Sequence, residues 1–327
     1  MRREDEEKMK CSKRGCQKPA VVYQKYSGLH LCEEHLVEDV ERRAKKEMRK
    51  RLMVERGDRI AVALSGGKDS SALLHLLKKI FKSRSDLKFF AVAVDEGIGG
   101  KGFEGFRAAT LRNAEAVAKR EGVPLYTFSF EQEFGFSVDE VAARGFEQAP
   151  CTFCGVLRRR ILETKARELE ATKVATAHNL DDEAQTVLIN FVRGDWVRLA
   201  RLEGGGGGKR RRAEFVPRIK PLRSVPEKEV ALYALAVGLP LVSLVSAHCP
   251  YAARSFRHTA KKMLNEFERR HPGTKFSLVR GYERLSEFLP TAAAEQQPSK
   301  RLLRCVRCGE ASASRICKAC EIVERMK

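Results

Sequence analysis

The sequence lacks the long apolar segments that membrane or exported proteins carry. No stretch approaches the roughly 18 consecutive apolar residues that cross a bilayer, and the start MRREDEEKMK has no apolar signal-peptide core. With 327 residues and 43% hydrophobic content, the chain can still bury a large core. We therefore expect a soluble, cytoplasmic protein with no membrane partner, built from about two domains with small attachments.

Acidic residues are in the minority. The sequence has 43 Asp and Glu residues and 63 Lys and Arg residues, so the formal net charge is +20. Such an excess attracts polyanions, and nucleic acid is the leading partner, although a generally basic surface is the simpler alternative. The glycine-rich segment 204–212 ends in four consecutive cations, and the basic helix pattern over 37–54 suits either a solvated connector or a phosphate contact.

The cysteines are not spread along the chain as a disulfide framework would spread them. Nine of the ten fall into three clusters, with Cys249 apart, and clustered cysteines in an intracellular chain indicate metal sites. Two of the clusters supply four ligands each and so complete a tetrahedral zinc shell without an open position. We predict two structural Zn²⁺ sites, one at Cys11, Cys16, Cys32 and His35 and one at Cys305, Cys308, Cys317 and Cys320.

Residues 59–80 predict a strand, a tight turn and a helix. The β-branched run ends at Ser65-Gly66-Gly67, and helical spacing of leucines follows. Two glycines, three hydroxyls and Lys68 at a helix N-terminus form a phosphate cradle. The Walker spacing would require glycine at Val62 and Ser or Thr at Asp69, so that motif is excluded. The alternative is an ordinary glycine turn.

A second glycine pattern, G-x-G-x-x-G over 100–105, suggests a dinucleotide site. Four loop residues separate it from the preceding strand, and the first phosphate loop already lies upstream. We therefore set aside a nicotinamide or flavin function.

Two further motifs carry candidate chemistry. Cys151 and Cys154 open a strongly basic helix, where the helix dipole and guanidinium groups are expected to lower the thiol pKa and favour nucleophiles or soft-metal ligands. Asp181 and Asp182 follow a strand at a sheet edge where ligands bind, so they are candidates for Mg²⁺ on ATP phosphates as well as ordinary helix-capping acids.

The motifs SGGKDS, VDEGI, PCTFCGVLRR, TAHNLDDEAQT, PRIKPLRSVPEKEV and CPYAARSFRH, framed by two zinc modules, resemble the TtuA/Ctu-type tRNA 2-thiouridine synthetases of the PP-loop ATP pyrophosphatase superfamily. The resemblance spans nearly the whole chain. It implies an α/β fold, a parallel sheet with helices on both faces, flanked by N- and C-terminal zinc-binding modules. It also implies a [4Fe–4S] cluster on Cys151, Cys154 and Cys249 with one iron free of protein ligands, a basic residue at Arg158 and an essential acid at Asp182. His248 stands where an acidic residue is expected, which departs from the family pattern.

From this resemblance we expect an ATP-dependent tRNA sulfurtransferase that adenylates the C2 oxygen of a uridine, at the wobble or the T-loop position, and replaces it with sulfur. The alternatives are a persulfide mechanism at Cys151 or Cys154, a cytidine thiolase or lysidine synthetase of the same fold, and a nonenzymatic RNA-binding zinc protein. The sulfur donor is sulfide or a ubiquitin-like thiocarboxylate carrier, and the family implies a homodimer. We expect ATP and Mg²⁺ on Ala63, Ser65, Gly66, Gly67, Lys68, Asp69, Ser70, Asp95, His178 and Asp181.

The expected organisation follows the motifs along the chain. We predict an N-terminal zinc finger over 1–37, a basic connector helix over 38–54, a PP-loop catalytic domain over 55–200, a C-terminal catalytic and tRNA-binding part over 201–300, and a zinc ribbon over 301–327.

Overall fold

The computed structural model describes residues 9–99, 105–202, 214–241, 249–288 and 303–327. Its centre is a five-stranded sheet with the strand order β5-β4-β3-β6-β7, in which every neighbouring pair is parallel. The strands are β3 (Arg59–Ala63), β4 (Lys88–Asp95), β5 (Leu125–Ser129), β6 (Lys173–Ala175) and β7 (Arg218–Ile219). Ile60 lies opposite Phe89 of β4 and Lys173 of β6, which sets the register. The expected parallel sheet of an α/β fold is confirmed.

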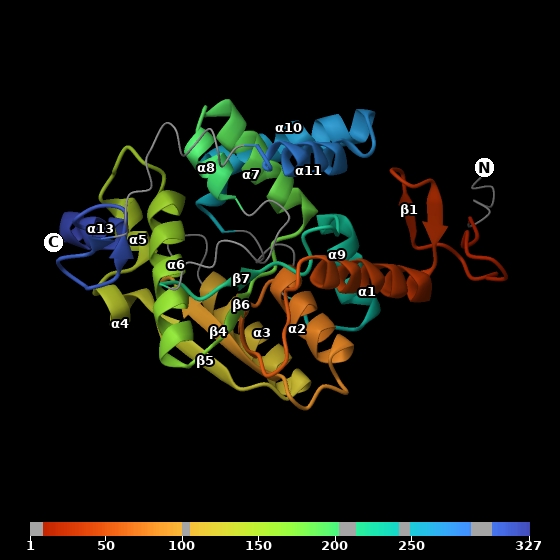
Figure 1. Cartoon of the computed structure of the whole chain (residues 1–327), viewed down its shortest axis with the longest axis horizontal. Coiled ribbons are helices and arrows are strands. Elements are labelled where there is room, and N and C mark those ends of the chain that lie inside the picture. The colour runs from red at the N-terminus through yellow and green to blue at the C-terminus, as the bar shows by residue number, and fades with distance from the viewer. Residues whose placement is uncertain (1–8, 100–104, 203–213, 242–248, 289–302) are drawn as a thin grey trace.

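Alternation along the strands gives the sheet two apolar faces, as a parallel sheet covered on both sides requires. Ile60 and Val62 point into the large core formed with α1 (Glu33–Lys50), α2 (Lys68–Ile80), α3 (Phe106–Glu121) and α9 (Glu227–Ala236). Ala61 and Val92 belong to the opposite face, which α6 (Pro150–Glu168) covers. The helices therefore lie on both faces of the sheet (Figure 1).

A group of helices packs beyond the sheet, at the top of Figure 1. Helix α7 (Leu180–Val192) contacts α8 (Trp196–Arg201), α10 (Phe256–Arg270) and α11 (Thr274–Leu285), and η1 (Ala252–Arg254) leads into α10. Leu180, Ala184, Leu264 and Val279 form a separate small core there. The short helices α4 (Phe130–Phe134) and α5 (Val138–Ala143) pack near α6.

The two terminal modules lie at opposite ends of the molecule (Figure 1). The N-terminal one is the antiparallel pair β1 (Val22–Gln24) and β2 (Leu29–Leu31), followed by α1. The C-terminal one contains β8 (Leu303–Arg304), β9 (Ala311–Ser312) and α13 (Lys318–Met326). It is anchored on α6, because Arg167 and Arg160 both pair with Glu310.

Most predicted elements agree with the structure within a few residues. The helix expected over 106–121 is found there, whereas the basic helix expected over 37–54 begins earlier, at Glu33. Residues 100–104 of the second glycine pattern, the segment 204–212 and His248 lie outside the described residues. None of the described helices combines the length and apolar content that a bilayer crossing requires.

Candidate nucleotide and cysteine site

The strand order reverses between β3 and β6, and this point positions the site. In open α/β sheets, ligands bind at the carboxyl ends of two adjacent strands whose following loops lead to opposite sides. The diverging loops leave a crevice there. Here the loop after β3 is Ser65–Lys68 and the loop after β6 leads to Asn179. Two motifs more than a hundred residues apart therefore face one another.

The turn after β3 can be made only with glycine at its second position. Gly66 has a φ of +80°, and a Cβ atom there would lie 1.8 Å from the Thr110 backbone oxygen. Asn113 donates to the Gly66 carbonyl at 2.7 Å and holds the turn against α3. The bare loop therefore presents its backbone directly before the N-terminus of α2, as an anion-binding turn requires.

The hydroxyls of the loop hold one another in place. Ser70 Oγ accepts from the Ser65 backbone N–H at 3.2 Å, lies 3.1 Å from Ser65 Oγ and donates to the Gly67 carbonyl at 3.0 Å. Ala63, which is the last residue of β3, precedes this loop. Hydrogen bonds within the loop therefore fix the shape of the cradle.

Lys68 and Asp69 open helix α2 and form an ion pair at 2.7 Å. Lys68 Nζ also lies 3.0 Å from Glu227 Oε1 at the start of α9. The Asn179 side-chain amide approaches Asp69 Oδ1 at 3.4 Å, so the two loops of the crevice are in contact.

Asp182 forms a capping box with Asn179 at the start of α7. Burial, with the charges of Asp69 and Glu227 adding to it, raises the pKa of Asp182 to about 6, although Arg257 at 3.7 Å opposes the shift. Burial also raises the pKa of Asp69. Asp182 nevertheless keeps 32% of its side-chain surface accessible. The oxygens of a carboxylate that is partly accessible to solvent and still desolvated suit a hard cation such as Mg²⁺.

The structure separates the two adjacent aspartates. Asp181 is buried, pairs with Lys275 of α11 and accepts from the Glu227 backbone N–H at 2.8 Å. Both of its oxygens are therefore engaged by the protein, whereas Asp182 remains partly accessible to solvent.

Two other expected ligands lie at strand ends. Asp95 ends β4, where it accepts from the Gly97 backbone N–H at 2.9 Å. His178 follows β6 and lies 2.9 Å from Thr176 Oγ1. Burial lowers the pKa of His178 to about 3, so its imidazole is neutral at physiological pH and contributes hydrogen bonds rather than charge.

Cys151, Cys154 and Cys249 come together although almost a hundred residues separate the last from the first two. Cys154 and Cys249 border the same apolar cluster, the Cys151 thiol donates to the Tyr251 carbonyl at 3.3 Å, and the charge of Cys249 affects the pKa of both other thiols. Among the described residues, these three thiols are not one of the groups whose ligand atoms all lie within 4.8 Å of one another. Three thiolates leave a structural zinc ion one protein ligand short. They suit an iron–sulfur cluster in which one iron has no protein ligand.

The expectation of lowered thiol pKa values at this helix start is wrong for the free thiols. Burial raises the pKa of Cys151 and Cys249, and it raises the pKa of Cys154 to about 12. The positive charge of Arg158 opposes the rise in the pKa of Cys154, whereas the negative charge of Glu96 adds to it. Arg158 and Glu96 form an ion pair with each other at 3.3 Å, so both charges lie near the thiol. Sequence shows the cations near a thiol and does not show its desolvation.

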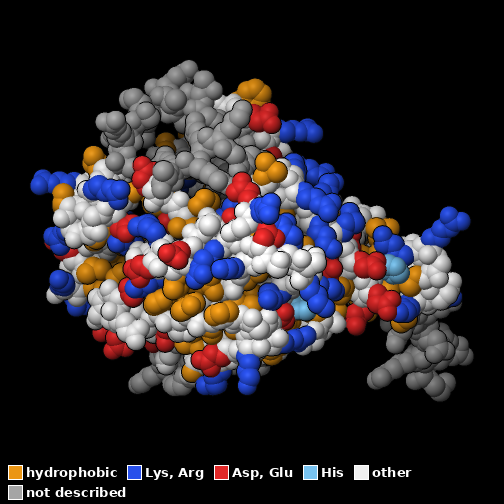
Figure 2. Space-filling model, turned by 60° about the horizontal axis from the view of Figure 1, so that its bottom comes forward, with side chains coloured by type: hydrophobic (Ala, Val, Ile, Leu, Met, Phe, Trp, Pro, Cys, Tyr) orange, Lys and Arg blue, Asp and Glu red, His pale blue; other side chains and the backbone are white. Residues whose placement is uncertain are grey.

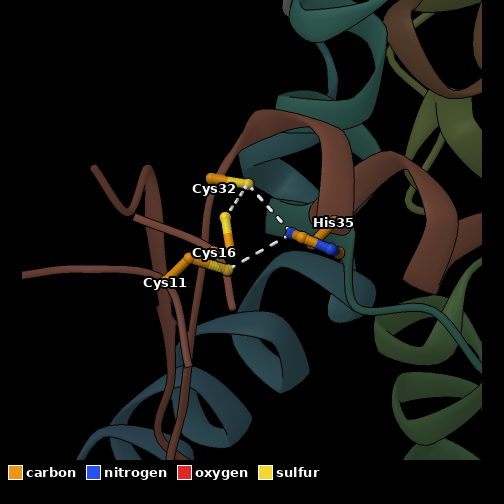
Figure 3. Close-up of side chains that lie close together, drawn as sticks. All are labelled: Cys11, Cys16, Cys32 and His35. Atoms are coloured by element: carbon orange, nitrogen blue, oxygen red, sulfur yellow. Dashed lines mark hydrogen bonds between the residues drawn. The ribbon is translucent and has the colours of Figure 1, made fainter. Parts of the chain in front are cut away.

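The N-terminal cysteine cluster has the compactness that the central one lacks. The ligand atoms of Cys11, Cys16, Cys32 and His35 all lie within 4.8 Å of one another (Figure 3). Cys16 Sγ is 3.8 Å from Cys32 Sγ, and His35 Nδ1 is 3.1 Å from Cys32 Sγ and 3.4 Å from Cys11 Sγ. These are the edges of one tetrahedron, so the group can hold a single metal ion. His30, which stacks on Tyr23, is not a member.

The C-terminal cluster has the same form. Cys305, Cys308, Cys317 and Cys320 also lie within 4.8 Å of one another, with 3.7 Å between Cys308 Sγ and Cys317 Sγ. Backbone N–H groups of Cys317 and Cys320 point to sulfur atoms of the group. Such contacts stabilise thiolates and fix their orientation.

No role is predicted from the sequence for several residues that contact the site. Glu227 contacts Lys68 across 159 positions, and Lys261 of α10 lies 2.7 Å from Glu227 Oε2. Glu96 is buried and pairs with Arg107 at 3.0 Å as well as with Arg158. An acidic residue after Pro226 predicts only an ordinary helix start, so only tertiary contacts identify these residues.

A glycine cradle at the switch point of a parallel sheet, with acids on the facing loop, defines a nucleotide-binding PP-loop protein. The comparisons agree. A model described as "PP-loop domain" matches residues 36–256, and one described as "2-thiouridine synthetase TtuA, N-terminal LIM domain" matches residues 10–37. The chain belongs to the family of PP-loop tRNA 2-thiolation proteins that includes NcsA and TtuA.

Individual relatives cover nearly the whole chain. The tRNA 2-thiolation protein NcsA of Haloferax volcanii is 38% identical over 98% of this chain and 99% of its own length. The tRNA-5-methyluridine(54) 2-sulfurtransferase of Pyrococcus horikoshii is 33% identical over 96% and 93%. The solved U34-tRNA thiolase NcsA from Methanococcus maripaludis, which contains a [4Fe–4S] cluster, is similar with a TM-score of 0.79 and 34% identity, over 97% of this chain and 96% of that one.

Proposed function

We propose that this protein is an ATP-dependent tRNA uridine 2-sulfurtransferase. The observation that carries the proposal is the combination of a phosphate cradle and a three-cysteine site in one chain, because replacing a carbonyl oxygen by sulfur requires both. The oxygen is a poor leaving group until it is adenylated, and the incoming sulfur needs soft ligands to hold it. Relatives named for this activity support the proposal over most of the chain.

In the activation step, backbone N–H groups of the loop between Ser65 and Ser70 and the ammonium of Lys68 bind the phosphates of ATP. Asp69 and Asp182 would hold Mg²⁺ through carboxylate oxygens, and the ion would offset the phosphate charge. The C2 oxygen of a flipped uridine attacks the α-phosphorus, and pyrophosphate leaves. His178 is neutral and can orient the nucleotide without adding charge. Asp181 supports the site through α9 and α11.

In the transfer step, sulfur replaces the adenylated oxygen and AMP leaves. We propose that Cys151, Cys154 and Cys249 hold a [4Fe–4S] cluster, a group present in the solved relative. When bound by three thiolates, such a cluster supplies an iron without a protein ligand, at which a sulfur atom can be held. Arg158, half exposed and paired with Glu96, places a cation beside the thiols.

We assign Zn²⁺ to the two compact cysteine groups, because four closed ligands suit structural zinc and leave no open position for catalysis. Lys and Arg side chains are spread over the face in Figure 2, among acidic ones, and the net charge of +20 suits a tRNA partner. We further propose a cytoplasmic homodimer that takes sulfur from sulfide or from a thiocarboxylate carrier, to be tested by light scattering and by supplying each donor separately.

The test is thiolation of unmodified tRNA by anaerobically purified protein with ATP, Mg²⁺ and sulfide, followed by mass spectrometry of nucleosides and by pyrophosphate release. Lys68→Ala should abolish both signals. Lys78→Ala removes the same charge from the far end of α2 and should retain both.

The other candidate functions make distinct predictions in this assay. Thiolation by aerobic, iron-free protein with a trapped persulfide on Cys151 or Cys154 would favour the persulfide mechanism. Tight tRNA binding without tRNA-dependent pyrophosphate release would favour a nonenzymatic RNA-binding protein and would contradict the proposal.

A further inference from the structure

One carboxylate at the crevice is shared by two lysines from distant parts of the chain. Glu227 Oε1 lies 3.0 Å from Lys68 Nζ and 3.0 Å from Lys261 Nζ. Because both nitrogens contact the same oxygen atom, they cannot lie more than about twice that distance apart. Two ammonium groups, one on the cradle helix and one on α10, are thus held as a pair.

Both ammonium groups remain available to a ligand. Lys68 and Lys261 keep 33% and 38% of their side-chain surface accessible. An ammonium has three N–H donors. Lys68 uses two of its N–H donors on Asp69 and Glu227. Lys261 contacts the two carboxylate oxygens of Glu227. Each lysine therefore has a donor to give without leaving the carboxylate.

The pair is not needed to attach α10 to the body of the protein. Leu264 of α10 is buried in the small core with α7, and Arg257 donates to Gln185 and Thr186 of that helix. A partly exposed ion pair adds little to such packing, because solvent screens the two charges. The position of Lys261 calls for another explanation.

We infer that Lys261 is a second phosphate-binding residue, which contacts the β- and γ-phosphates of ATP together with Lys68, and that Glu227 holds the two ammonium groups at the spacing of neighbouring phosphates. The inference rests on the proposed function, since it assigns a residue to the ATP site proposed there. Lys261 lies beyond the matched PP-loop domain, which ends at residue 256. Helix α10 is then part of the nucleotide site and more than a cover for α7.

The experiment measures dissociation constants of the full-length protein for ATP, inorganic pyrophosphate and AMP by calorimetry with Mg²⁺ present. Lys261→Ala is compared with Lys262→Ala, which removes the same charge from the next, exposed position of α10. Loss of a charge-assisted phosphate contact should weaken ATP and pyrophosphate at least about tenfold. AMP, which lacks the β- and γ-phosphates, should bind within twofold of the unmodified protein. Lys262→Ala should leave all three constants unchanged.

Other outcomes overturn the inference. Equal weakening of ATP and AMP by Lys261→Ala would mean that the variant displaces the whole site, and ATP binding equal to that of Lys262→Ala would mean that Lys261 touches no phosphate. Lys261→Arg keeps the charge and should restore ATP affinity to within a few fold, which guards against a folding defect in the alanine variant. If the unmodified protein binds neither ATP nor pyrophosphate, the proposed function fails together with this inference.

Discussion

Two adjacent carboxylates, Asp181 and Asp182, should respond to the same substitution with opposite changes in stability. Asp182 is an acid whose ionised form is desolvated, so the folded state disfavours its charge. Asp181 is an acid whose charge is paired with Lys275 inside the protein. Aspartate-to-asparagine changes at the two positions alter one atom each and keep the shape of the side chain.

For Asp182→Asn we expect a gain in stability at neutral and alkaline pH. The rise in pKa from 3.8 to about 6 corresponds to about 3 kcal/mol at most. Because about a third of the side chain is accessible, solvent screening reduces this to about 1–2 kcal/mol. The amide oxygen can still accept from the Asn179 backbone N–H, so the helix cap is retained.

The sign of the pH dependence follows from the raised pKa. The folded state holds the proton more tightly than the unfolded chain, so the penalty is absent below the unfolded pKa of 3.8, grows with pH and is complete above about 6. The gain from Asp182→Asn should therefore be full at pH 8 and roughly half as large at pH 5.

For Asp181→Asn we expect the reverse. Lys275 would keep its neutral contact with Asn265 at 2.7 Å but lose its charged partner in a buried position. Removing one member of a buried ion pair costs about 3–5 kcal/mol. The substitution should also weaken ATP binding, because Asp181 fixes the N-terminus of α9, which carries Glu227.

The assay is the melting temperature of both variants across pH 5–8, without Mg²⁺ or nucleotide so that no cation offsets the carboxylates. A change of 1 kcal/mol moves the melting temperature by about 2–4 °C in proteins of about 150–250 residues, and by less in a longer chain. A lower melting temperature for Asp182→Asn at pH 8, or a gain independent of pH, would refute the desolvated position of this acid. Asp182→Asn should also lose thiolation activity. A variant that is more stable but inactive would show that Asp182 serves the reaction rather than the stability of the fold.

Three other predictions concern the cradle, the metals and the nucleic acid. Gly66→Ala should abolish ATP binding, because its Cβ would collide with the Thr110 carbonyl, and unchanged ATP affinity by calorimetry would contradict the turn geometry. Elemental analysis should find two zinc ions per chain that survive air, whereas Cys249→Ser should remove the brown, oxygen-sensitive iron and leave zinc in place; iron that persists in this variant would remove Cys249 from the ligand set. The logarithm of tRNA affinity should fall with the logarithm of salt concentration by about 0.7–0.9 per phosphate contacted, and a flat dependence in filter binding would argue against the charge-based footprint.

Much of the architecture could be predicted because it depends on local patterns. The apolar run before Ser65 and the leucine spacing after it determine a strand, turn and helix by periodicity alone, and the helix over 106–121 follows in the same way. Cysteine spacing likewise predicted which residues form the two compact groups, since each lies within a short segment.

The working geometry of the site depends on contacts between segments that no local pattern relates. Asp181 and Asp182 are equivalent in the sequence, and only the packing of α9 and α11 engages Asp181 and leaves Asp182 partly accessible. Burial, which sets the pKa of Cys154 and of Asp182, is a property of the folded chain and opposes what neighbouring charges suggest. Lys261 shares Glu227 with Lys68 of the cradle because α10 packs beside α7, so this contact was decided by tertiary structure alone.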